Sequence, residues 1–234
     1  MSKMGMVYII PSLLDEEGMP AMPSYILTAI KHCNVLFTEN ERTARRFLKQ
    51  LSKDIVIDDF EWVTIHKSEK EILPVFKQKL KEGKIAGIIS EAGCPGIADP
   101  GQILITAAHD MNVEVRPLVG PNSILLALMA SGLNGQQFRF AGYLPIESYK
   151  RIKAIRELEI ESKKKEMTQI FIETPYRNNQ LFDALIKTCM ASTRLCIATN
   201  LTSSNEFIKT KTIEYWKKNK PDLHKKPSIF CLLA

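Results

Sequence analysis

The sequence predicts an α/β fold. Short apolar segments alternate with longer amphipathic ones along the chain, which is the pattern of strands separated by helices. Residues 85–90 are almost continuously apolar, as expected for a strand of a parallel sheet that is covered on both faces. Loops rich in glycine and proline follow several apolar segments, and open α/β sheets bind ligands beyond the carboxyl ends of their strands.

The first half of the chain predicts a regular series of elements. Apolar runs predict strands over residues 6–10, 35–38, 63–66, 85–90 and 113–118. Helical spacing of apolar residues predicts a helix capped by Ser24 and further helices over residues 42–51, 69–82 and 103–111. The helix over 69–82 is the clearest, because Ile72, Phe76 and Leu80 share one face and Gly83 ends it. The loop after Leu118 is the predicted boundary between domains 1–118 and 119–234.

The second half continues the alternation. Asn122 can cap a helix over residues 123–131. Strands are expected over residues 138–143, 169–173, 195–199 and 228–233. A charged helix is expected over residues 149–166, and another starts at Pro175, since proline suits the first turn of a helix. The pattern over residues 207–216 does not decide between strand and helix.

Composition excludes several classes of protein. No apolar run approaches the ~18 residues of a membrane span, and the apolar stretch near the N-terminus is too short for a signal peptide. We therefore expect a cytoplasmic protein that does not contact a membrane. The five cysteines are widely spaced and form no C-x-x-C pair, so we expect buried thiols and neither a zinc site nor another metal site. The net charge of +6 weakly favours a polyanionic partner.

Three loops at predicted strand ends are candidates for chemistry. The loop over residues 90–101, SEAGCPGIADPG, has glycines that let a ligand approach the backbone and acids that disfavour phosphate. It lacks the Walker and dinucleotide-binding glycine patterns, and its alternative interpretation is a tight crossover turn. The loop over 119–123 has simple helix capping as its alternative. The third loop, 173–177, places an acid, a phenol and a guanidinium in five residues, with a plain helix start as its alternative.

Together these segments resemble the tetrapyrrole methylase superfamily, the class III S-adenosylmethionine-dependent methyltransferases. The likeness is greatest to the family that methylates the ribose 2′-hydroxyl of a cytidine in small-subunit ribosomal RNA. The family motif S-D-A-G-T-P-x-I-S-D-P-G is matched by residues 90–101, and P-x-P-G-P-S-A-x-x-x-A-L-x-x-S-G-L by residues 116–133. Three further family motifs are matched by FRFAGYLP at residues 138–145, by TENER at residues 38–42 and by IETPYR at residues 172–177.

The resemblance implies two α/β domains, the first with a mostly parallel sheet and the second with a mixed sheet. It places S-adenosylmethionine in the cleft between them, usually within a homodimer, and no metal takes part. The matching cofactor contacts are Pro11, Ser90, Glu91, Ala92, Gly93, Pro95, Ala98, Gly120, Pro121, Asn122, Ser123, Tyr143, Pro175 and Tyr176. We expect ribosomal RNA or the small ribosomal subunit as the partner, with substrate contacts from Arg42, His66 and Arg177.

Methyl transfer to a ribose hydroxyl needs a proton acceptor, because the hydroxyl is a weak nucleophile. Glu39 and Glu173 are the candidates, and each has an alternative as a structural acid paired with Arg42 or Arg177. For His66 the alternative is an ordinary hydrogen-bonded histidine. Two basic helical segments could contact phosphate. The first contains Arg42, Arg45, Arg46 and Lys49; the second, which contains Lys150, Arg151, Lys153 and Arg156, is interleaved with acids and is interpreted as a solvated face.

Some segments depart from the family pattern. Asn40 and Glu41 replace an Asp and a Thr, and residues 199–203 lack the family's Arg, Glu and Lys. The cofactor half is thus better preserved than the substrate half. Besides an RNA 2′-O-methyltransferase, two hypotheses stay open: a methylase of small, tetrapyrrole-like molecules, and a cofactor-binding paralogue without catalysis.

Overall fold

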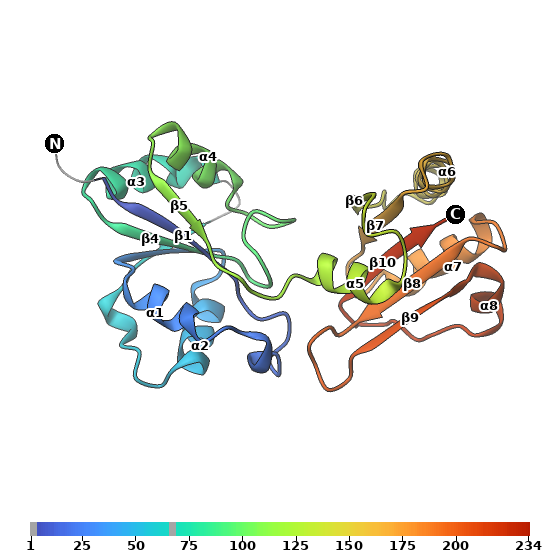
Figure 1. Ribbon diagram of the computed structural model, residues 1–234, viewed down its shortest axis with the longest axis horizontal. Helices are drawn as coiled ribbons and strands as arrows, with labels where there is room; N and C mark the ends of the chain where they lie inside the picture. The colour runs from blue at the N-terminus through green and yellow to red at the C-terminus, as the bar shows by residue number, and fades with distance from the viewer. Residues whose placement is uncertain (1–3, 66–68) are drawn as a thin grey trace. The chain divides into compact units, whose positions relative to one another are not determined.

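The computed structural model describes residues 4–65 and 69–234. The chain forms two compact units, Met1–Asn122 and Ser123–Ala234, and each contains one five-stranded sheet (Figure 1). The predicted α/β class, with a parallel first sheet and a mixed second sheet, is confirmed.

The first unit is built on a fully parallel sheet with the strand order β3-β2-β4-β1-β5. Its central strands are apolar on both faces, and those faces are covered by helices. The strands are β1 (Met6–Ile10), β2 (Val35–Thr38), β3 (Glu61–Thr64), β4 (Ile85–Ile89) and β5 (Glu114–Pro117).

Alternate residues of these strands enter two separate cores. Ile10, Leu36 and Ile89 pack with helices α1 (Tyr25–Lys31) and α2 (Glu41–Leu51). Val7, Phe37 and Ile88 pack on the other face with α3 (Glu69–Lys81) and α4 (Gln102–Asp110). Figure 1 shows the two helix pairs on opposite sides of the sheet. Two short 3-10 helices, η1 (Met19–Ala21) and η2 (Ile57–Asp59), lie in the connections.

The second unit has a mixed sheet with the strand order β6-β7-β10-β8-β9. Strands β6 and β7 are parallel, and β10 is antiparallel to both β7 and β8, so β6, β7 and β8 end at the same edge. Their bounds are β6 (Phe138–Tyr143), β7 (Thr168–Ile172), β8 (Arg194–Thr199), β9 (Phe207–Thr212) and β10 (Ser228–Leu233). Helices α6 (Ser148–Lys165), α7 (Asn178–Thr188) and α8 (Ile213–Lys218) share one core with this sheet, and α5 (Ser123–Ser131) packs on β8, β9 and β10.

Apart from shifts of one residue at several element ends, the structure differs from the predicted elements at β3 and α7. Strand β3 lies two residues earlier than expected. Helix α7 begins at Asn178 rather than at Pro175, because residues 174–177 form a turn in which the Arg177 N–H donates to the Thr174 carbonyl. The undecided segment is strand β9 followed by helix α8.

The cysteines are reduced, and four of the five are buried. Burial raises the pKa of the Cys33 thiol to about 12, so this thiol is unreactive at neutral pH. Across residues 4–65 and 69–234, no cluster of three metal-ligating side chains occurs. Within the same ranges, none of the helices has the length and apolar character needed to cross a bilayer.

Candidate active site

The carboxyl ends of the parallel strands bring several loops to one edge of the first sheet. Loops 11–16, 90–101 and 118–122 follow β1, β4 and β5. The chain leaves β1 towards α1 on one face and leaves the neighbouring β4 towards α4 on the other. The loops diverge at this point, which is where open α/β sheets form ligand crevices.

Loop 90–101 adopts backbone conformations that favour glycine. Gly93, Gly96 and Gly101 have φ values of +74°, +77° and +129°, a region that side chains rarely occupy. A Cβ on Gly93 would also lie 3.3 Å from Leu14 Cδ2. Ala98 has φ +63° despite its side chain. The glycines therefore set the course of the loop across the ends of the strands.

Loop 11–16 is joined to loop 90–101 by backbone hydrogen bonds. The Ser12 N–H donates to the Gly93 carbonyl at 2.8 Å, and the Gly93 N–H donates back to Ser12 at 3.3 Å. The buried Ser12 hydroxyl donates to the Ser90 carbonyl at 2.9 Å. The two loops follow the neighbouring strands β1 and β4. These hydrogen bonds between them therefore fix the floor of the site.

Loop 118–122 packs against the same floor. A Cβ on Gly120 would overlap the ring of Pro11, so glycine is required for the close approach of these two loops. The Cys94 thiol donates to the Pro121 carbonyl at 3.6 Å. Pro11, Gly93, Gly120 and Pro121, all predicted cofactor contacts, therefore lie together in the first unit.

Three carboxylates gather beside these loops. Glu39 follows β2, and its Oε2 accepts a hydrogen bond from the Glu91 N–H at 3.4 Å. Burial raises the pKa of Glu39 above its usual range, and the charge of Glu91 adds to the rise. Burial, followed by the charges of Glu39 and Glu91, raises the pKa of Asp99 to about 6. Such a site suits a cation and repels phosphate.

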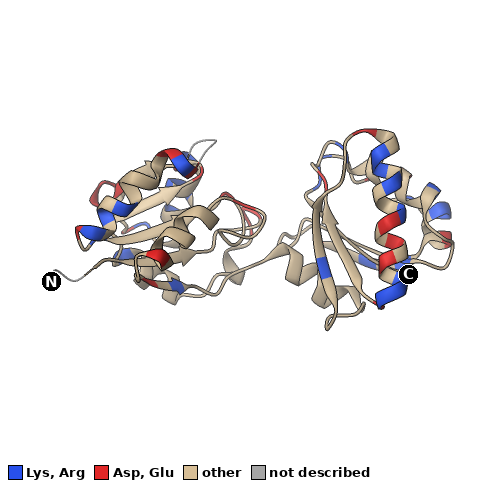
Figure 2. Ribbon diagram, turned by 90° about the horizontal axis from the view of Figure 1, so that it is seen from above, with Lys and Arg blue, Asp and Glu red and all other residues tan. Residues whose placement is uncertain are grey.

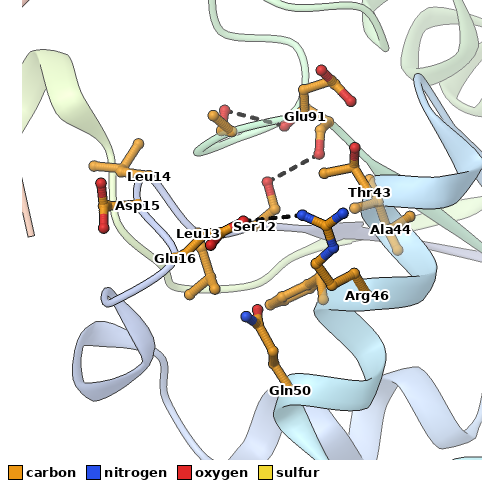
Figure 3. Close-up of a pocket in the computed structure, with 14 residues that line it drawn as sticks. Ser12, Leu13, Leu14, Asp15, Glu16, Thr43, Ala44, Arg46, Gln50 and Glu91 are labelled. Atoms are coloured by element: carbon orange, nitrogen blue, oxygen red, sulfur yellow. Dashed lines mark hydrogen bonds and ion pairs between the residues drawn. The ribbon is translucent and has the colours of Figure 1, made fainter. Parts of the chain in front are cut away.

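A pocket of about 280 Å³ opens between loop 11–16, strand β4 and helix α2. Leu13, Leu14, Phe47 and Ile89 supply apolar walls, and Ser12, Asp15, Thr43, Gln50 and Glu91 supply polar groups. Figure 3 shows Thr43, Arg46 and Gln50 reaching from α2 towards the loop. The Arg46 guanidinium bonds to Glu16 at 3.0 Å. The pocket therefore combines apolar surface with convergent polar groups, as small-molecule sites do.

The second unit has its own cluster at the shared end of β6 and β7. The Glu173 side chain is buried, and its Oε1 accepts from Arg177 Nη2 at 2.7 Å and from the Thr174 N–H at 2.7 Å. Its Oε2 is enclosed without a hydrogen-bond partner among the described residues. Tyr143 and Tyr176 are 60% and 69% exposed. The predicted pairing of Glu173 with Arg177 is therefore present.

The structure also places the remaining predicted site residues. Ser90, Ala92, Pro95, Ala98 and Asn122 belong to the loops of the first unit, and Ser123 begins α5 of the second. Pro175 accepts a backbone hydrogen bond from Lys225 beside Tyr176. Arg42 is exposed on the first turn of α2. His66 lies outside the described residues.

Sequence patterns missed several residues of the pocket and misjudged one residue of the second basic segment. Thr43, Arg46 and Gln50 lie three to four positions apart on α2, so helical spacing could have indicated a shared face. In the first basic segment, Arg45 pairs with Glu41 at 2.6 Å and Lys49 donates to the Ile55 carbonyl. In the second, Arg151 is buried, so the interpretation of that segment as a solvated face is wrong for this residue.

Comparison with known proteins gives consistent matches. The sequence pattern of the tetrapyrrole (corrin/porphyrin) methylases matches residues 26–215. The chain is 29% identical over its full length to "Ribosomal RNA small subunit methyltransferase I" of Buchnera aphidicola subsp. Schizaphis graminum, of which it covers 79%.

Two solved structures share the fold at low sequence identity. The methyltransferase CobJ superposes with a TM-score of 0.63 at 14% identity, over 98% of this chain and 94% of CobJ. Uroporphyrin-III C-methyl transferase from Thermus thermophilus, solved with S-adenyl homocysteine, superposes with a TM-score of 0.57 at 15% identity, over 98% and 97% of the two chains. With a family match that spans most of its length, the chain belongs to the tetrapyrrole (corrin/porphyrin) methylases.

Proposed function

We propose that this protein is an S-adenosylmethionine-dependent methyltransferase that acts on a ribose 2′-hydroxyl of small-subunit ribosomal RNA. The observation that carries the proposal is the conformation of loop 90–101. Three glycines with positive φ let this loop pass across the carboxyl ends of the strands of the first sheet. The family membership and the Buchnera relative's name support the reaction and the RNA substrate.

The residues at this edge fit the proposed cofactor. S-adenosylmethionine carries a positive sulfonium and an ammonium group, and loop 90–101 contains two acids and no Lys or Arg. Glu39, Glu91 and Asp99 form a negative cluster there. Backbone groups of Ser90, Glu91, Ala92 and Gly93 can contact the cofactor without side-chain obstruction at Gly93. We further propose, from the family resemblance, contacts from the other residues assigned above: Pro11, Pro95, Ala98, Gly120, Pro121, Asn122, Ser123, Tyr143, Pro175 and Tyr176.

The bound cofactor supplies a methyl group on a positively charged sulfur. The protein's residues align the ribose 2′-oxygen with that methyl group, which lowers the entropic part of the activation barrier. They also accept the proton of the 2′-hydroxyl, which makes the oxygen a better nucleophile. In our proposal Glu39 accepts the proton, since its raised pKa makes its carboxylate a stronger base than an exposed one. Glu173 is the second candidate through Oε2, because its Oε1 is already bonded to Arg177. Arg42, His66 and Arg177 are proposed substrate contacts.

We also propose that the protein works as a cytoplasmic homodimer. The proposal rests on the family resemblance. Light scattering coupled to size-exclusion chromatography should give twice the chain mass of 26.5 kDa. A mass of one chain at micromolar concentration would contradict the dimer.

Labelled S-adenosylmethionine tests the activity. Incubation with small ribosomal subunits that lack the modification should transfer label to RNA, and nuclease digestion should release a 2′-O-methylated nucleoside. Cofactor binding without transfer to RNA or subunits would instead favour a catalytically inactive paralogue.

Calorimetry tests the cofactor site. Gly93→Trp should abolish binding of S-adenosylmethionine and S-adenosylhomocysteine, because the indole would fill the approach to the backbone. Gly93→Ala and Gly83→Ala form a matched pair, since both replace a glycine with φ near +75° (+74° and +76°). Gly83 ends α3 at the opposite edge of the sheet, so its variant should bind the cofactor normally. Equal binding by wild type and Gly93→Trp would contradict the proposal.

A further inference from the structure

The outer strand β9 and the helix α8 that follows it carry positive charge that nearby acids do not balance. Residues 207–220, FIKTKTIEYWKKNK, contain five lysines and one acid, Glu214. Of these lysines, Lys220 alone forms an ion pair within residues 4–65 and 69–234, with Asp183 at 2.9 Å. On the long helix α6, by contrast, Figure 2 shows acidic residues among the basic ones. The β9–α8 segment is therefore a surface that favours an anionic partner.

The register of the sheet places three side chains of β9 in one row. Lys209 lies opposite Ile197 in the β8–β9 ladder, and Ile197 belongs to the core that α6, α7 and α8 cover. Phe207 and Lys211 are each two residues from Lys209, and alternate side chains of a strand point to the same face. Neighbours in this row are about 6.8 Å apart along the strand. Phe207 is 38% exposed, and Lys211 is exposed.

Tyr215 of α8 joins the two lysines of the row. The Lys209 Nζ donates to the Tyr215 hydroxyl at 2.9 Å, and the Lys211 Nζ lies 5.4 Å from the centroid of the same ring. A phenolic oxygen that accepts a hydrogen bond still has its own proton to donate. Neither lysine forms an ion pair with any carboxylate of the described chain. Two ammonium groups and a hydroxyl thus gather as donors without an anionic acceptor.

The position of Lys209 is fixed before any partner arrives. A lysine on an outer strand is ordinarily a solvated surface charge, which describes Lys211 but not Lys209. Lys209 is only partly exposed and is held by Tyr215, whose ring packs against the core of the second unit. A donor that is already ordered loses less conformational entropy when it binds a ligand.

The aromatic end of the row indicates the kind of anion. Single-stranded nucleic acids bind where cations follow the backbone and aromatic rings stack on the bases. Phe207 is next to Lys209 in the row and has exposed surface for such stacking. A free inorganic phosphate would use the lysines but would leave Phe207 without a role.

We propose that the row formed by Phe207, Lys209 and Lys211, together with Tyr215, binds single-stranded RNA. The ammonium groups of the two lysines and the Tyr215 hydroxyl donate to backbone phosphates, and Phe207 stacks on a neighbouring base. The identity of the polymer rests on the proposed function. These residues hold the RNA on the second unit and take no part in methyl transfer.

The test compares two double variants of the whole chain. Lys209→Gln with Lys211→Gln removes two charges from the row. Lys163→Gln with Lys164→Gln removes two exposed charges from the last turn of α6 and is the matched control. The probe is a short single-stranded RNA copied from small-subunit ribosomal RNA, followed by fluorescence anisotropy. The row variant should bind about tenfold more weakly, and its slope of log affinity against log salt should fall by about 1.4. The control should bind within about twofold of wild type.

Phe207 gives a second readout that charge alone would not move. Phe207→Ala should weaken RNA binding about fivefold or more, because a stacked base loses its aromatic platform. The slope against salt should stay as in wild type, since no phosphate contact is lost. Phe207→Tyr keeps the ring and should bind as wild type does. Circular dichroism spectra of all variants should match that of wild type.

The proposal is overturned if the Lys209/Lys211 variant binds the RNA as wild type does, or if the Lys163/Lys164 control loses as much affinity. It is also overturned if the row is needed for binding of inorganic phosphate or anionic phospholipid vesicles but not of RNA. Methyl incorporation is measured on the same samples. Row-dependent RNA binding without methyl transfer by wild type would refute the proposed function and leave this site standing. Methyl transfer with unchanged RNA binding by the row variant would do the reverse.

Discussion

At the scale of single residues, the carboxylates at the first sheet couple the site to pH. The pKa of Asp99 rises from 3.8 to about 6 through burial and the charges of Glu39 and Glu91. Between these two values the folded protein holds more protons than the unfolded chain, so its free energy of unfolding falls as pH rises. Ionised Asp99 thus lowers stability at neutral pH and strengthens the attraction for a cation.

Asp99→Asn should remove this dependence. At pH 7 the variant should be more stable than wild type by about 1 kcal/mol, because solvent screening at this partly exposed carboxyl reduces the ~3 kcal/mol that the full shift represents. Urea unfolding at a series of pH values between 4 and 7 measures the difference between the two proteins, which cancels other titrating groups. Cofactor affinity should rise through pH 6 in wild type but not in the variant. Parallel stability profiles would contradict the coupling.

Glu39→Gln should separate proton transfer from binding. The amide keeps the size of the side chain but cannot accept the hydroxyl proton, so kcat should fall about 10²–10⁴-fold. Loss of one of the three carboxylates should weaken cofactor binding far less than it lowers kcat. Glu114→Gln, which alters an exposed carboxylate bonded to Arg116 at the start of β5, is the control and should retain activity. A Glu39→Gln enzyme with normal kcat would shift the role of proton acceptor to Glu173.

The sequence could predict the residues of loop 90–101 because they are contiguous. It could not show that Glu39 meets Glu91 across strands β2 and β4, since that contact depends on sheet order. Nor could it distinguish Arg151 from its exposed neighbours, because alternating charges do not tell which face of α6 is buried.

At the scale of elements, Asn40 has a structural role that explains why it can replace the Asp of the family pattern. Its Oδ1 accepts from the Arg42 and Thr43 N–H groups and caps α2. An Asp, which the family pattern has at this position, can make the same bonds. The departure from the family pattern at Asn40 is therefore conservative for the helix.

Asn40→Ala should lower the free energy of unfolding by about 1 kcal/mol, because two N–H groups of α2 lose their acceptor. Asn40→Asp should match or exceed wild type, since a negative charge is favourable at a helix N-terminus. Urea unfolding followed by circular dichroism measures both variants. An alanine variant as stable as wild type would contradict the capping role.

Element boundaries were predictable where local signals act alone. Helix α5 spans residues 123–131 as expected, because its apolar run lies between a strong turn and Gly132. Helix α7 starts later than its proline suggested, since the Glu173–Arg177 pair holds residues 174–177 in a turn. The preference of proline for first turns cannot anticipate an ion pair.

At the scale of the whole molecule, each unit has its own core. The cores around Phe37 and Leu36 belong to the first unit, and the core around Phe230 belongs to the second. Sequence alternation predicted this class of fold but not the strand orders, which follow from long-range pairing. The chain has two tryptophans, Trp62 on β3 and Trp216 on α8, so each unit has its own fluorescent reporter.

Trp216→Phe should destabilise the second unit, because the buried indole fills its core and donates to the Leu195 carbonyl at 2.9 Å. Trp62 fluorescence should then report an unchanged transition for the first unit, while circular dichroism shows an earlier second transition. Trp62→Phe supplies the complementary reporter. Coincident transitions in both variants would mean that the units unfold together.

The strand order of the first sheet leaves β3 and β5 as its outer strands. Outer strands offer unpaired backbone groups to other chains, and charge and proline hinder that association. Strand β5 carries exposed Glu114 and Arg116 and ends at Pro117, and β3 begins at Glu61, which bonds to Lys79. The lateral borders of the sheet are thus protected against edge-to-edge aggregation, while its carboxyl end stays open to a ligand.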